Sequence, residues 1–194
     1  MTVKIAVIIG STRPGRNGEQ VAKWVHETAS RRTDAEFELV DLLDFKLPHL
    51  DEAMPASLGQ YANAHTQAWA AKVAEFDGYI FVTPEYNHST SGALKNALDF
   101  VYGEWNNKAA GFVSYGASAG GSRAVEHLRL IAGELQLADV RAQLALSLVT
   151  DFENFSVFKP TAQHETALEK VLDQTVAWSG ALQSLRSEEL EAAA

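Results

Sequence analysis

Five short apolar segments recur along the chain, and most are rich in β-branched or aromatic residues. They are Val3–Ile9, Phe37–Asp41, Gly78–Thr83, Ala109–Tyr115 and Val140–Leu148, of which the second is the weakest. A continuous apolar run of this length is typical of a strand buried on both faces of a parallel sheet, whereas a half-exposed strand alternates between apolar and polar residues. The pattern therefore predicts five parallel strands.

Segments with apolar residues three or four positions apart separate these strands and predict helices over residues 21–29, 61–76, 94–101, 124–135 and 168–185. Alternating strands and helices with right-handed crossovers predict a three-layer, doubly wound α/β fold. Five strands favour the flavodoxin-like order 2-1-3-4-5. We expect residues 1–194 to form this one domain. The long irregular connection over residues 44–63 is a candidate lid or substrate loop.

Composition narrows the classes of function. The 194 residues are 46% hydrophobic and 21% charged, as in globular domains. A net charge of −9 disfavours nucleic-acid and membrane-surface roles and favours a small-molecule ligand. The chain has no cysteine, and its apolar N-terminal run is short and contains Lys4, so we expect a cytoplasmic protein. The six histidines lack metal-site spacing, so no metal site is predicted.

The loop after the first strand, Gly10–Gly18, combines glycines and hydroxyls with Arg13 and Arg16 just before a helix. Backbone N–H groups, the positive helix end and guanidinium groups suit a phosphate, although a tight turn with solvated arginines is the alternative. The spacing is not G-x-G-x-x-G, and Arg16 and Asn17 stand where a P-loop has Lys and Ser or Thr, which disfavours a nucleoside triphosphatase. We interpret Asp41 as a turn or cap residue rather than a ribose ligand.

The loop after the third strand reads Pro84-Glu85-Tyr86-Asn87, followed by a Ser-Thr-Ser run that opens a helix. A flavin requires an apolar or aromatic face and hydrogen-bond donors near its pyrimidine ring. Tyr86 offers the face, and Asn87 offers a donor and an acceptor. The alternative is a plain turn followed by a helix N-cap. His88 is given no catalytic role.

The loop after the fourth strand contains G-x-S-x-G over residues 116–120, the spacing of a hydrolase nucleophile elbow. A serine hydrolase would use Ser118, His164 and either Asp139 or Asp151. That alternative leaves the first two loops without a function.

Together, the three loops strongly resemble those of the NADPH-dependent FMN reductase family, whose members carry P-E-Y-N, then Gly-x-x-Lys-Asn, and a third loop G-x-x-x-G-G-x-R. The resemblance covers roughly the first two thirds of the chain. It implies that the FMN phosphate is held by the first loop and the isoalloxazine ring by the other two. The residues it implicates are Ser11, Arg13, Arg16, Asn17, Pro84, Glu85, Tyr86, Asn87, Gly116, Ser118 and Gly120.

The resemblance also implies an activity. NADPH or NADH would reduce bound FMN, and a free flavin, quinone, azo compound or metal oxyanion would then accept the electrons in a ping-pong cycle. No protein acid or base is required for hydride transfer. An electron carrier without turnover is the alternative. Family members commonly form homodimers, or dimers of dimers, and we select Phe100, Tyr102 and Trp105 as candidate interface residues, with core packing as the other interpretation.

Overall fold

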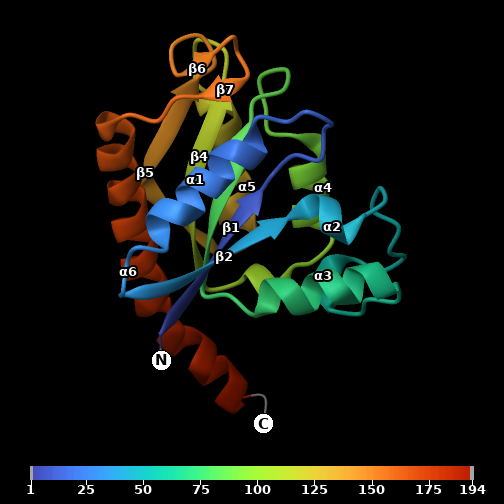
Figure 1. Ribbon diagram of the computed structural model, residues 1–194. Coiled ribbons are helices and arrows are strands. Elements are labelled where there is room, and N and C mark those ends of the chain that lie inside the picture. The colour runs from blue at the N-terminus through green and yellow to red at the C-terminus, as the bar shows by residue number, and fades with distance from the viewer. Residues whose placement is uncertain (1, 193–194) are drawn as a thin grey trace.

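The structure is a computed structural model that describes residues 2–192, with side chains described for residues 2–186. Its centre is a five-stranded parallel sheet in the order β2-β1-β3-β4-β5 (Figure 1). The strands are β1 (Val3–Ile9), β2 (Ala35–Asp41), β3 (Gly78–Pro84), β4 (Lys108–Gly116) and β5 (Leu137–Ser147). The predicted flavodoxin-like order is therefore confirmed.

Helices cover both faces of the sheet and complete three layers (Figure 1). One face carries α1 (Gly18–Ala29) and α6 (Ala162–Ala192), and the other carries α3 (Ala64–Ala74), α4 (Gly92–Asp99) and α5 (Ser122–Glu134). Successive side chains of a strand point to opposite faces. In β1, residues 5 and 7 therefore fill the core under α1 and α6, while residues 6 and 8 fill the other core.

The connection after β2 is largely irregular, as expected, but it contains the short helix α2 (Leu42–Phe45) and the 3₁₀ turn η1 (Ala56–Leu58). Its far end is fixed at the start of α3, because the Glu52 carboxylate accepts hydrogen bonds from the backbone N–H groups of residues 62 and 63 at 3.0 and 2.9 Å. A lid function for this connection stays a prediction.

The proposed interface role of the aromatic residues after α4 is wrong for two of the three. Phe100 and Trp105 are completely buried inside the chain, where Trp105 packs against Trp69 and Tyr79. The Trp105 indole also donates to the Leu98 carbonyl at 3.2 Å. Core packing therefore explains both residues. Tyr102 is partly buried, and its hydroxyl donates to the backbone of α5.

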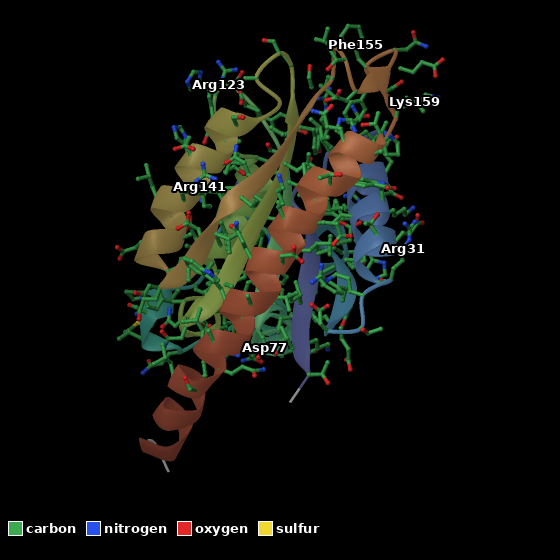
Figure 2. All side chains as sticks on the ribbon, turned by 90° about the vertical axis from the view of Figure 1, so that its left-hand side faces the viewer. Arg31, Asp77, Arg123, Arg141, Phe155 and Lys159 are labelled. Atoms are coloured by element: carbon green, nitrogen blue, oxygen red, sulfur yellow. The ribbon has the colours of Figure 1, made fainter. Side chains whose placement is uncertain are left out.

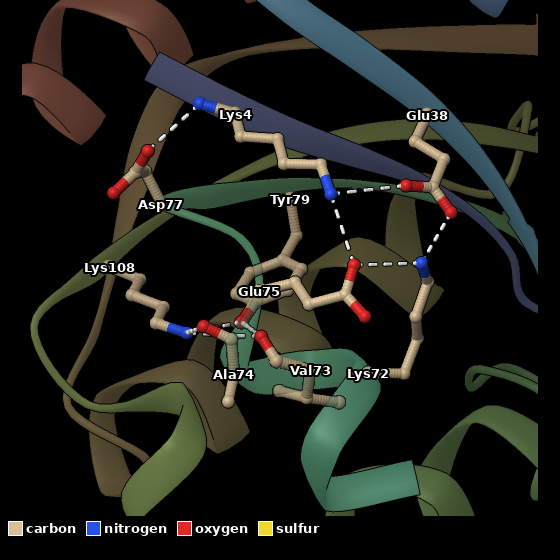
Figure 3. Close-up of polar contacts among 9 residues, drawn as sticks. All are labelled: Lys4, Glu38, Lys72, Val73, Ala74, Glu75, Asp77, Tyr79 and Lys108. Atoms are coloured by element: carbon tan, nitrogen blue, oxygen red, sulfur yellow. Dashed lines mark hydrogen bonds and ion pairs between the residues drawn. The ribbon is translucent and has the colours of Figure 1, made fainter. Parts of the chain in front are cut away.

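Lys108, at the start of β4, is a buried lysine, only 4% exposed. Its ammonium donates to the Val73 and Ala74 carbonyls at 3.0 and 3.4 Å, at the end of α3, and contacts the Tyr79 hydroxyl at 3.1 Å (Figure 3). Cationic groups suit the carbonyl end of a helix. Burial, followed by repulsion from Arg186, nevertheless lowers the pKa of Lys108 to about 7.

This lowered pKa predicts a pH dependence of stability. In the unfolded chain a lysine has a pKa of about 10.4, so between about pH 7 and pH 10 the unfolded state binds more protons than the folded state. The Lys108 contribution should therefore raise the free energy of unfolding as the pH rises through that window. We expect Lys108→Met to remove this rise in urea titrations at several pH values. Lys72→Met, which removes a partly exposed lysine paired with Glu38 and Glu75, should retain it (Figure 3). Equal slopes for the wild type and Lys108→Met would contradict the assignment.

Candidate functional site

Three loops meet at the carboxyl ends of β1, β3 and β4. The strand register brings the ends together, because Ile9 pairs with Val82 and Pro84 pairs with Tyr115. The loops surround a cavity of about 460 Å³, which we call the three-loop pocket. It is lined by Arg13, Gly15, Arg16, Asn17, Pro84, Glu85, Tyr86, Tyr115, Gly116, Ala117, Leu148, Phe155 and Ser156. Ligands of doubly wound folds bind at this edge.

In the first loop, the two arginines have different roles. The Arg16 side chain is only 7% exposed and is paired with Asp41, and it also donates to the Ser11 carbonyl at 2.8 Å. Asp41 in turn accepts from the Leu43 N–H at 2.9 Å, which confirms its interpretation as a cap residue. Arg13 is exposed on the pocket and forms no ion pair within the described part of the chain. Arg16 therefore stabilises the loop, whereas the Arg13 guanidinium is available to bind a ligand.

The start of α1 also lies on the pocket, because its N-cap residue Asn17 is part of the lining. Asn17 occupies the N-cap position without making a side-chain capping bond, and instead donates to the Phe155 carbonyl at 2.8 Å. The first N–H groups of a helix need a partner from outside the helix, and an anion is well suited to them.

The second loop is a tight turn joined to both of its neighbours. Tyr86 and Ser89 exchange backbone hydrogen bonds at 2.9 and 3.1 Å, and Asn87 and His88 between them have φ of 50° and 74°, as in a type I′ turn. The Tyr86 hydroxyl meets the buried Ser11 hydroxyl at 3.0 Å. Tyr86 is thus held at the pocket, while Asn87 lies outside its lining.

Glu85 is the most unusual side chain of the pocket. Its carboxylate is only 6% exposed, and one oxygen is paired with Arg123, at the start of α5 directly after the third loop. The other oxygen, Oε2, is buried and has no hydrogen-bond partner in the described residues. A buried carboxylate oxygen without a donor is costly, so this atom is suited to accept a hydrogen bond from a bound ligand.

The glycines of the third loop serve different purposes. A Cβ on Gly116 would lie 2.9 Å from the Gly121 nitrogen and 3.2 Å from the Glu85 Cβ, so the pocket wall has no room for a side chain there. Gly120 has a φ of 60°, and a Cβ added there would lie only 3.0 Å from the Cβ of Ala145 in β5. Gly120 and the exposed Ser118 both lie outside the pocket lining.

The hydrolase alternative lacks its triad. Ser118 is absent from the residues with positive φ, and α5 begins four residues later, so no strained elbow forms. Both nitrogens of His164 are engaged, with Nδ1 accepting from the Thr161 N–H at 3.2 Å and Nε2 lying 3.6 Å from Asp151. Asp139 is paired with Arg129. Neither His164 nor Asp139 is therefore available as the free base of a triad with Ser118.

Sequence analysis missed one wall of the pocket, a two-stranded hairpin formed by β6 (Phe152–Glu153) and β7 (Val157–Phe158). Figure 1 shows it at the carboxyl end of the sheet. Each strand has two residues, too few for a periodic signal. The only sequence signal was the Phe-x-x-Phe-x-x-Phe spacing from Phe152 to Phe158.

Other surface features carry less chemistry. A larger open groove, of about 1200 Å³, runs along β5 between α5 and α6, but the site-forming loops do not reach it. Within residues 2–192 no helix has the length and apolar character to cross a membrane. No cluster of three metal-binding side chains occurs in the described residues.

A parallel sheet of order 2-1-3-4-5 with helices on both faces defines a flavodoxin-like α/β protein. The family model for NADPH-dependent FMN reductases matches residues 3–151, and the chain belongs to that family. It is thus an oxidoreductase of the NAD(P)H-dependent FMN and quinone reductase type.

Two curated relatives illustrate the family. An NAD(P)H-dependent FMN reductase of Schizosaccharomyces pombe is 42% identical over 153 residues, which cover 78% of this chain and 76% of the relative. An NAD(P)H:quinone oxidoreductase of Solanum tuberosum is 35% identical over 139 residues, 70% of each chain. Among solved structures, the flavoenzyme FerB of Paracoccus denitrificans shares the fold, with a TM-score of 0.70 at 21% identity over 92% of this chain and 98% of FerB.

The pairing of Arg16 with Asp41 can be tested by a double-mutant cycle. Arg16→Ala and Asp41→Ala should each lower the free energy of unfolding by about 1–3 kcal/mol, because each leaves a partly buried charge without its partner. The double variant should lose clearly less than the sum. The exposed pair Lys95 and Asp99 on α4 is the control, with an expected coupling below about 0.5 kcal/mol. Additive losses for Arg16 and Asp41 would show that Arg16 does not brace the loop through Asp41.

Proposed function

We propose that the protein binds FMN in the three-loop pocket and uses NADPH or NADH to reduce a small-molecule acceptor. The observation that carries the proposal is that the three loops converge on one cavity. In the described residues, Arg13 forms no ion pair and Glu85 Oε2 has no hydrogen-bond partner, so both can bind a ligand there. Membership of the FMN reductase family supports the same ligand.

The donors at the first loop fit the phosphate of FMN. Arg13 supplies a guanidinium that forms no ion pair in residues 2–186, and the start of α1 supplies its first backbone N–H groups. The buried Ser11 hydroxyl supports the loop through its contact with Tyr86. Of the residues implicated by the resemblance, Arg16 and Asn17 contribute by shaping the loop, because their side chains are committed to Asp41 and to the Phe155 carbonyl.

The rest of the pocket lining fits a flat heterocycle. Pro84 and Tyr86 offer apolar surface, Gly116 leaves the space that a side chain would fill, and Glu85 Oε2 can accept from a ring N–H. Burial raises the pKa of Tyr115, so its hydroxyl keeps its proton at neutral pH. Asn87, Ser118 and Gly120 lie outside the pocket lining and contribute through the backbone of their turns.

Bound FMN supplies the hydride acceptor and the electron donor, so the nicotinamide and the final acceptor use the pocket in turn, as a ping-pong cycle requires. The chain contributes position, because its side chains fix the ring and the phosphate. No residue is assigned as a catalytic acid or base. We propose a quinone, azo compound, free flavin or metal oxyanion as the acceptor.

The homodimer and the cytoplasmic location remain part of this proposal. The cysteine-free composition supports a reducing compartment. With Phe100 and Trp105 buried inside the chain, a dimer must use other residues.

The purified protein should bind FMN and discriminate strongly against riboflavin, which has the same ring but no phosphate. We expect the dissociation constant for riboflavin to be at least tenfold higher in fluorescence titrations. NADPH oxidation with a quinone should then depend on added FMN. Equal affinity for the two flavins would contradict a phosphate-reading loop, and FMN binding without NADPH oxidation would indicate an electron carrier instead.

Arg13→Ala should raise the dissociation constant for FMN by roughly 10- to 150-fold, since a hydrogen bond to a charged group contributes about 1.5–3 kcal/mol. Turnover at saturating FMN should be nearly restored, because the phosphate takes no part in the chemistry. Arg31→Ala, which removes an exposed arginine just after α1, is the matched control and should bind FMN normally (Figure 2). A rate defect that persists at saturating FMN would assign Arg13 to the nicotinamide nucleotide rather than to FMN.

A further inference from the structure

The hairpin of β6 and β7 carries an aromatic side chain that the family resemblance does not explain. We propose that the hairpin is a fixed flap over the three-loop pocket and that Phe155 is the wall against which the planar aromatic ring of a bound ligand packs. The proposal rests on the proposed function, because FMN and the nicotinamide nucleotide both carry such rings. The hairpin lies beyond residues 3–151, the segment matched by the family model.

Hydrogen bonds connect the turn of the hairpin and its second strand to the start of α1. Asn17 donates to the Phe155 carbonyl at 2.8 Å, and Gln20 donates to the Ser156 carbonyl at 2.5 Å. The Gln20 side-chain oxygen also accepts from the Phe158 N–H at 2.8 Å. These bonds hold the turn beside the helix end that faces the pocket. The flap is therefore positioned by the same helix that would meet the phosphate.

Phe155 itself adopts a backbone conformation that a bulky residue rarely takes. Its φ is 58°, and that of Asn154 is 52°. Asparagine tolerates the left-handed region, but an aromatic residue there is strained. Such strain is concentrated at ligand sites, where a side chain is needed for more than the fold.

The hairpin does not need the Phe155 ring for its own packing. Its strands are anchored by Phe152 and Phe158, which are 6% and 8% exposed and whose rings lie 5.2 Å apart. Phe158 also packs edge-on against Trp24 of α1. Phe155, by contrast, is 64% exposed while lining the pocket. Figure 2 places Phe155 at the end of the molecule that also carries Arg123, remote from Asp77.

The neighbouring side chains suit a ring that is joined to a phosphate. Arg13 and the start of α1 lie on the same pocket as Phe155, and Leu148 adds apolar surface. An aromatic side chain stabilises a stacked heterocycle through buried area and ring electrostatics, without choosing among heterocycles. Phe155 therefore fits as an affinity determinant for a nucleotide ring.

Three variants at one position test the inference. Phe155→Ala removes the ring, Phe155→Asn removes the ring and the strain, and Phe155→Tyr keeps the ring. We expect the first two to raise the FMN dissociation constant, or the KM for NADPH in the FMN-loaded enzyme, by roughly 5- to 30-fold. Phe155→Tyr should stay within about twofold of the wild type. The thermal midpoint should not fall in Phe155→Ala and should rise in Phe155→Asn.

Fluorescence titration of FMN and steady-state NADPH kinetics identify which ring is involved. A loss confined to FMN affinity assigns the isoalloxazine, and a loss confined to the KM for NADPH assigns the nicotinamide nucleotide. Val157→Ala is the matched control, because Val157 is 48% exposed on the same hairpin and does not line the pocket.

Unchanged FMN and NADPH affinity in both ring-deleting variants would overturn the inference. So would an affinity loss that follows a fall in thermal midpoint, or an equal loss in Val157→Ala, since either would indicate a structural role for the hairpin. Wild-type FMN binding is measured in the same titrations. A wild type that binds FMN beside unaltered variants refutes only the role of Phe155, whereas a wild type that binds no FMN refutes the proposed function.

Discussion

The parallel pairing of β1, β3 and β4 is the constraint on which the site depends. These strands are buried on both faces of the sheet. A shift of the strand pairing by one residue would move each side chain to the opposite face, where a closely packed core leaves no space for it. The register is therefore fixed, and with it the points where the three loops begin. Glu85 directly follows β3, and Arg13 lies four residues after the end of β1. A precise site on loops is possible because the loops inherit the rigidity of the sheet.

Polar contacts then join the loops to one another. Ser11 meets Tyr86, the Glu85 N–H donates to the Tyr115 carbonyl at 2.9 Å, and the Glu85 carboxylate is paired with Arg123. The first contact links two loops directly, and the other two connect Glu85 of the second loop to β4 and to the start of α5. Movement of one loop would therefore break contacts of another, so the pocket is largely formed before a ligand binds. A preformed site saves the ordering entropy that a mobile one would lose on binding.

The sequence predicted the sheet well because β1 and β3 are continuous apolar runs with many β-branched or aromatic residues, and both features favour a buried strand. It also placed the loops at one edge, since that follows from topology alone. It could not distinguish Arg13 from Arg16, because pairing with Asp41 depends on where β2 ends in space. It misjudged Phe100 and Trp105, because an aromatic cluster looks the same in a core as at an interface. The hairpin at Phe155 was too short to leave a pattern.

Charge explains how a protein with a net charge of −9 can hold a phosphate. Three arginines approach the three-loop pocket, but Arg16 is neutralised by Asp41 and Arg123 is neutralised by Glu85. The remaining guanidinium, that of Arg13, acts together with the start of α1. A positive field confined to one arginine and one helix end attracts a small anion at short range. At longer range salt screens this field, and the net negative charge of the protein repels a polyanion. Under the proposed function, selection of a single phosphate group over a phosphate polymer would follow from how the arginines are paired, not from how many there are.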